Sequence, residues 1–130
     1  MPNYSFTKSL RLLDANAYKT VFDDAKLKVS TQHSLFLARQ NGLNHPRLGL
    51  VIAKKNIRLA KNRNRIKRII RESFRLQQHQ LGAVDTVVLA RRGLDQLDNA
   101  QLHAVFNRLW SQLEQKSNQQ PKVKQSKTDS

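Results

Sequence analysis

The chain has 130 residues, with 24 Lys and Arg against 9 Asp and Glu, a formal net charge of +15 and no cysteine. The length suits one domain with a hydrophobic core, and the lack of cysteine excludes disulfides, thiolate metal sites and a cysteine nucleophile. No apolar run nears the roughly 20 residues that span a bilayer, and the N-terminus lacks the apolar core of a secretory signal. We therefore expect a cytoplasmic protein with no membrane partner. Such an excess of positive charge favours a polyanionic partner, and nucleic acid is the commonest one.

The first half of the chain predicts one short helix and three strands. Asp14 is a candidate N-cap, and Tyr18, Val21 and Phe22 follow it on one helical face. We expect strands at 27–30, 34–39 and 48–53, with turn residues at 41–46 before the last of them. The last strand is a continuous apolar run, which is typical of a strand covered on both faces.

The second half predicts a basic helix ended by Gly82, a strand at 84–90 and a closing helix at 98–114. Trp110 falls beside the apolar face of the closing helix, where we expect the edge of the core. We expect one RNA-binding domain over 1–116 and, because the residues beyond it are polar and aperiodic, a disordered tail at 117–130. The order αβββαβα indicates helices packed on a sheet, an α/β (α+β) sandwich whose topology the pattern alone leaves open.

The positive charge is concentrated at 54–75, which holds ten Lys or Arg and one acidic residue, Glu72. At the helical advance of 100° per residue, one face carries Ile66, Ile69, Ile70, Ser73, Phe74 and Leu76. The opposite face carries Lys61, Asn64, Lys67, Arg68, Arg71 and Arg75. A solvated face is the plain alternative, but it normally carries Glu at i, i+4 to relieve repulsion. The arginine forks suit phosphate oxygens, so we favour an RNA-binding face.

Residues 60–68 (AKNRNRIKR), followed by RESFR at 71–75, resemble the RNR motif of the bacterial ribonuclease P protein. The Ala-Lys-Lys at 53–55, Tyr18 and Phe22 in the first helix, and the closing helix fit the same family. The resemblance extends over roughly residues 8–114. One departure is Lys61, where the family often carries an apolar residue.

The resemblance implies a central four-stranded sheet, with the basic helix in a left-handed β-α-β crossover against the general right-handed preference. It implies the protein component of ribonuclease P, which binds the catalytic RNA and the 5′ leader of precursor transfer RNA and assists Mg²⁺-dependent removal of that leader. The catalytic centre and its Mg²⁺ then belong to the RNA. We accordingly expect no catalytic residue, no metal or cofactor held by protein side chains, and no DNA partner.

The motif and the basic helix face together predict RNA contacts at Lys54, Lys55, Arg58, Lys61, Arg63, Asn64, Arg65, Lys67, Arg68, Arg71 and Arg75. The resemblance also predicts a leader cleft lined by Tyr18, Phe22 and Phe36, whose rings can stack on single-stranded bases. For each of these rings, burial in the core is the alternative. The turn after the fourth strand, 91–93, either extends the basic surface or is solvated.

Two other functions stay open on the residues alone. A basic ribosomal or RNA-assembly protein would bind structured RNA with no catalytic context. Only the motif favours the ribonuclease P function over this one. A DNA-binding helix would sit in a compact helical triad, whereas strand-like runs flank the basic helix here. The four histidines, at 33, 45, 79 and 103, lie in four segments without ligand spacing, so neither a metal site nor a histidine acid–base pair is expected.

Overall fold

The computed structural model describes residues 10–12 and 14–119, and its elements follow the predicted order αβββαβα. Between β4 and α3 the chain adds one short 3₁₀ turn, η2. The elements are α1 (Ala15–Asp23), β1 (Leu27–Ser30), β2 (Ser34–Gln40), β3 (Arg47–Val51), α2 (Ala60–Leu81), β4 (Val84–Ala90), η2 (Leu94–Gln96) and α3 (Asn99–Gln119). The Asp14 carboxylate caps α1 as predicted, since it accepts the Ala17 N–H at 2.9 Å.

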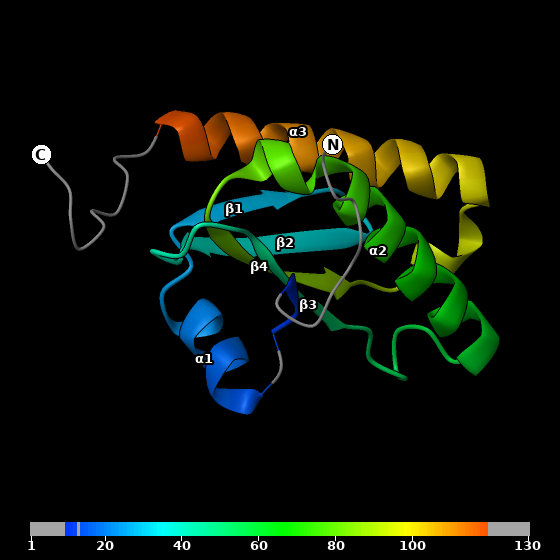
Figure 1. Ribbon diagram of the computed structural model, residues 1–130. Coiled ribbons are helices and arrows are strands. Elements are labelled where there is room, and N and C mark those ends of the chain that lie inside the picture. The colour runs from blue at the N-terminus through cyan, green and yellow to red at the C-terminus, as the bar shows by residue number, and fades with distance from the viewer. Residues whose placement is uncertain (1–9, 13, 120–130) are drawn as a thin grey trace, which may run out of the picture.

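The four strands form one mixed sheet in the order β1-β2-β4-β3. β1–β2 and β2–β4 are antiparallel, whereas β3 and β4 are parallel neighbours joined through α2. The left-handed sense expected for this crossover stays a prediction. In Figure 1, α3 lies above the sheet and α1 below it, and α2 lies beside α3. The α+β sandwich predicted from the sequence is confirmed.

The edge strand β3 is held on both sides. On its outer side, the Leu12 N–H donates to the Leu48 carbonyl at 3.0 Å. On its inner side, Arg47 makes two hydrogen bonds to the buried carboxylate of Asp85 on β4, at 2.8 and 2.6 Å. The bond to Asp85 raises the pKa of the Arg47 guanidinium above its usual value. These contacts fix the strand that leads into the basic segment.

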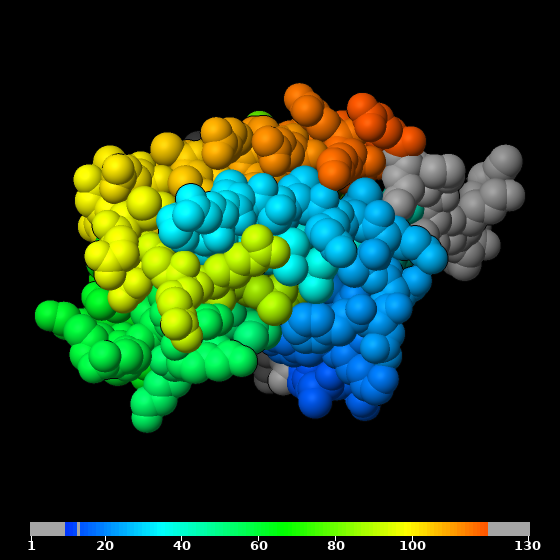
Figure 2. Space-filling view, turned by 180° about the vertical axis from the view of Figure 1, so that it is seen from behind, coloured from blue at the N-terminus to red at the C-terminus, as the bar shows by residue number. Residues whose placement is uncertain are grey.

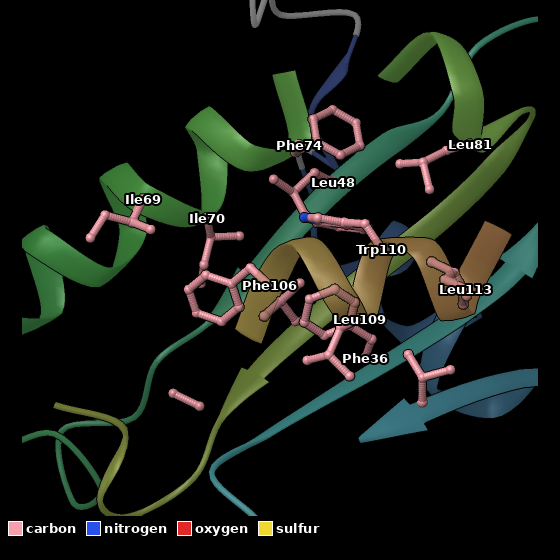
Figure 3. Packing of buried hydrophobic residues seen from close by; sticks show 14 of the residues in the cluster. Phe36, Leu48, Ile69, Ile70, Phe74, Leu81, Phe106, Leu109, Trp110 and Leu113 are labelled. Atoms are coloured by element: carbon pink, nitrogen blue, oxygen red, sulfur yellow. The ribbon is translucent and has the colours of Figure 1, made fainter. Parts of the chain in front are cut away.

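The main core lies between the sheet and the pair α2–α3, and Trp110 is at its centre (Figure 3). The indole ring lies 4.5 Å from the ring of Phe36 on β2 and 5.6 Å from that of Phe74 on α2, centroid to centroid. Its N–H donates to the hydroxyl of Ser73 at 2.8 Å, and that hydroxyl donates to the Ile70 carbonyl at 2.9 Å. The prediction that Trp110 lies at the edge of the core is wrong. Because α3 packs against both α2 and the sheet, the indole ring lies between Phe74 and Phe36 and is fully buried.

Several predicted boundaries also differ from the structure, most of them by one or two residues. β3 ends at Val51 instead of residue 53, and α3 runs on to Gln119 instead of ending at 114. Ser117 is buried and the Lys116 ammonium donates to the Lys28 carbonyl at 2.8 Å, so the predicted tail began too early. The rest of that tail, 120–130, lies outside the described residues. Leu76, which was predicted on the aliphatic face of the basic helix, is 51% exposed. It lies about 80° from Ile66 around the helix, at the edge of that face.

Candidate RNA-binding surface

The outward side of α2 carries a mostly basic stripe, which also includes the amide of Asn64 and the carboxylate of Glu72. Lys61, Asn64, Arg68 and Arg71 are exposed and recur every three or four residues, which places them in one row. Lys67 and Arg75 are half-buried at the margins of the stripe. Within residues 10–12 and 14–119, no Lys or Arg of α2 takes part in an ion pair. The repulsion along this face is therefore left for a partner to neutralise.

The loop between β3 and α2 extends the same charge. Lys54, Lys55 and Arg58 are exposed and lead directly into the first turn of the helix. Leu59 occupies the N-cap position, and its side chain accepts no hydrogen bond. The first-turn N–H groups and the positive end of the helix dipole thus add to the attraction of the loop for anions.

Two predicted RNA contacts, Arg63 and Arg65, turn inward instead. Arg63 Nη1 donates to the carbonyls of Ile57 (3.0 Å) and Arg58 (2.9 Å). Arg65 donates through Nη1 to the Leu97 carbonyl and the Asn99 side chain, and through Nη2 to the Asp95 carbonyl. Both side chains are half-buried and tie loops to α2. A signal for Arg63 was present in the sequence, since it falls about 60° from Ile66, on the aliphatic side of the helix.

The opposite face of the sheet carries α1 and two of the three predicted cleft aromatics. Tyr18 is half-buried, and its hydroxyl accepts the Leu50 N–H of β3 at 3.0 Å. Its ring lies directly over Gly49, where an added Cβ would come within 2.7 Å of the ring. Phe22, one turn later, is 43% exposed. This face therefore carries the exposed ring of Phe22, one helical turn after the fixed ring of Tyr18.

Phe36 does not belong to this group, and its prediction as a cleft residue is wrong. It is fully buried on the other face of the sheet, stacked on Phe106 with a centroid distance of 6.3 Å. Successive side chains of a strand point to opposite faces, so its neighbour Leu37 faces α1 and packs in the cluster with Tyr18. The run Leu-Phe-Leu is apolar on both faces, and its pattern cannot tell which face is which.

In the part of the chain that the structure describes, few side chains are placed to form a metal site or a catalytic site. His45 and His79, distant in sequence, line one small hollow of about 370 Å³, yet no three His, Asp or Glu side chains there converge on a point that would hold a metal ion. None of the described helices is both long and apolar enough to span a membrane.

A mixed sheet with a basic helix on one face and the aromatic side chains of α1 on the other points to a small α+β RNA-binding protein. The ribonuclease P family model matches residues 6–114. Over 113 residues the chain is 53% identical to the ribonuclease P protein component of Pseudomonas aeruginosa, covering 87% of this chain and 84% of the relative. That of Chromohalobacter salexigens is 53% identical over 114 residues, 88% and 89% of the two chains.

Solved structures agree with these relatives. The Staphylococcus aureus RNase P protein has a TM-score of 0.74 at 25% identity, covering 80% of this chain and 94% of that one. The Thermotoga maritima RNase P protein has a TM-score of 0.61 at 28% identity, covering 75% and 96%. The chain belongs to the ribonuclease P protein family. It is thus a subunit of an endoribonuclease holoenzyme that matures the 5′ end of transfer RNA, which favours this function over that of a ribosomal or RNA-assembly protein.

Proposed function

We propose that the stripe on α2 and the loop before it bind the catalytic RNA of ribonuclease P, while the α1 side of the sheet binds the 5′ leader of precursor transfer RNA. The observation that carries the proposal is the basic stripe on α2, whose cations form no ion pair with any described residue. A duplex or folded RNA presents phosphates at a spacing that such a row of cations can neutralise, with release of counterions.

The basic residues divide by role in this proposal. The exposed side chains contact phosphates directly, and these are Lys54, Lys55, Arg58, Lys61, Asn64, Arg68 and Arg71. Lys67 and Arg75 contact RNA from the margins of the stripe. Arg63 and Arg65 hold the backbone that presents these groups, and their remaining N–H donors can still reach a phosphate.

The reaction needs no protein acid or base in this arrangement. Ribonuclease P chemistry uses Mg²⁺, and we propose that RNA holds these ions. The contribution of the protein is to neutralise phosphate charge beside them and to hold the substrate. Neutralising phosphates lets two RNA molecules approach each other closely, since their mutual repulsion falls.

The leader is proposed to lie against α1, with one base stacked on Phe22. The ring of Phe22 is accessible, and it lies one helical turn after Tyr18, whose ring is held by Gly49 and the Leu50 N–H. Stacking of a base on an aromatic side chain contributes about 1–3 kcal/mol. Such stacking tolerates any base, which suits leaders of varied sequence.

A leader-length experiment tests this proposal. Phe22→Ala should weaken binding of the reconstituted holoenzyme to a long-leader precursor by about 1–3 kcal/mol and leave a leaderless substrate unaffected. The measurement is equilibrium affinity for both substrates, with a melting curve for each protein. Leu76→Ala is the matched control, because Leu76 is similarly exposed at 51% but lies on α2. Equal losses of affinity for the two substrates would show that Phe22 does not contact the leader.

A further inference from the structure

A hollow of about 710 Å³ opens between the loop before α2 and the segment after β4. Figure 2 shows these two segments side by side on one face of the molecule, the first in green and the second in yellow-green. The residues that line the hollow are Lys55, Asn56, Arg58, Leu59, Arg92, Gly93, Asp95 and Gln96. Its volume lies in the range of small-ligand sites.

We infer that this hollow takes one unpaired nucleotide of the bound RNA, with the base against Leu59 and the phosphate at the cationic rim. The inference rests on the proposed function, because the RNA that fills the hollow is the RNA bound by the stripe on α2. The inference adds a site that recognises a base to a surface that the proposed function describes only by its charge. This site includes Arg92 and Gln96, which lie outside the RNR segment.

Leu59 is the first argument for a base. It is 49% exposed and occupies the N-cap position of a 22-residue helix, where its side chain makes no capping hydrogen bond. Leucine is among the poorest N-cap residues, while Ser, Thr, Asp and Asn are the best. Neither burial nor capping therefore accounts for a leucine here. An apolar branched side chain inside a hollow offers a surface for the flat face of a nucleobase.

The charge of the rim is the second argument. Lys55, Arg58 and Arg92 give three cations against the single carboxylate of Asp95, which also accepts the Asn62 amide at 3.4 Å. An apolar patch rimmed by a net positive charge matches the two parts of a nucleotide, the base and the phosphate. The side-chain amide of Gln96 can both donate to and accept from a base edge.

The rigidity of the walls is the third argument. Arg63 bonds the Arg58 carbonyl of one wall, and Arg65 bonds the Asp95 carbonyl of the other. The Asn56 amide donates to the Ala90 carbonyl at 3.0 Å, which joins the first wall to the end of β4. A hollow fixed before binding loses little conformational entropy on binding. The base must be unpaired, because bases stacked in an RNA helix do not present their faces to a protein.

Two RNA probes of equal charge separate the base from the backbone. The full chain is titrated with a six-nucleotide oligoadenylate and with an abasic ribose–phosphate hexamer, each carrying a fluorophore, and anisotropy is recorded. We expect the wild type to bind the oligoadenylate at least fivefold more tightly. The comparison is repeated in a Phe22→Ala background, which removes the exposed ring proposed for the leader. In that background Leu59→Ser should reduce the preference to near unity. Serine is a favourable N-cap, so this change does not weaken the helix.

Leu76→Ser is the matched control, since that leucine is equally exposed on the same helix but outside the hollow, and it should keep the preference. Arg92→Ala should weaken both hexamers alike, while Arg108→Ala on α3 should not. A base preference that survives Leu59→Ser in the Phe22→Ala background, or a Phe22→Ala protein that binds both hexamers equally, overturns the inference and leaves the charge-based RNA interface standing. A wild type that binds neither hexamer overturns the inference and the proposed interface together.

Discussion

The arginines of the RNR segment fall into two groups according to what their guanidinium groups contact. Arg63 and Arg65 donate to backbone carbonyls and are half-buried, whereas Arg68 and Arg71 are exposed and take part in no ion pair within the described residues. A charged donor on a partly buried carbonyl is a strong hydrogen bond. The same residue type therefore serves the fold in the first group and the surface in the second.

This division predicts opposite phenotypes. Arg63→Ala removes a charged donor from the carbonyls of Ile57 and Arg58, so we expect a loss of about 1–3 kcal/mol in the free energy of unfolding. Arg71→Ala should change stability by less than about 0.5 kcal/mol but weaken RNA binding. Urea unfolding followed by fluorescence of Trp110, the only tryptophan, measures the first quantity and filter binding the second. Equal stability of the two variants would contradict the division.

At the scale of elements, a buried polar contact joins α2 to α3. The indole N–H of Trp110 donates to Ser73, and both side chains are buried within an apolar cluster. A buried donor that loses its acceptor retains its desolvation cost. The contact also fixes the rotation of α2, which determines which of its faces points outward. Basic residues reach the surface partly because Ser73 and its aliphatic neighbours face inward.

Ser73→Ala should accordingly lower the free energy of unfolding by about 1–3 kcal/mol, because the Trp110 N–H is left without an acceptor. Denaturant unfolding gives the value, and the fluorescence maximum of the native state should shift with the lost hydrogen bond. Ser111→Ala on the exposed side of α3 is the control and should be near neutral. A Ser73→Ala variant as stable as the control would show that the contact contributes nothing.

Element prediction succeeded where the hydrophobic period was clear and failed where it was not. The apolar positions of the closing helix recur at helical spacing, and that helix forms. Its last turn was missed because Ser117, although buried, carries no apolar signal. On β2, apolar residues on both sides of Phe36 hid which face meets the main core, and the partners α3 and α1 decided it.

At the scale of the whole molecule, the net charge of +15 predicts RNA binding that depends strongly on salt. The logarithm of the binding constant should fall linearly with the logarithm of salt concentration, by about 0.7–0.9 for each neutralised phosphate. Replacing Arg68 and Arg71 together by Ala should reduce the slope by about one to two units. The measurement is affinity for the catalytic RNA over a salt series. An unchanged slope would place the exposed face of α2 outside the interface.

The molecule as a whole also predicts dependence on its RNA. The purified, RNA-free protein supplied with Mg²⁺ should not cleave precursor transfer RNA, since the described residues bring together no metal-binding trio. Adding the catalytic RNA should restore cleavage at the 5′ end. Site-specific cleavage by the protein alone would contradict an accessory role.

The sequence by itself determined the order of elements, the basic face of α2 and the family, because these depend on local periodicity, on net charge and on a contiguous motif. Only the tertiary structure decided that Phe36 is core, that Arg63 and Arg65 hold loops, and that Leu59 and Arg92 share a hollow. The physical reason is that each of these depends on contacts between segments far apart in the chain. Arg65 meets Asp95 and Leu97 some thirty residues away, and no local pattern encodes such a meeting.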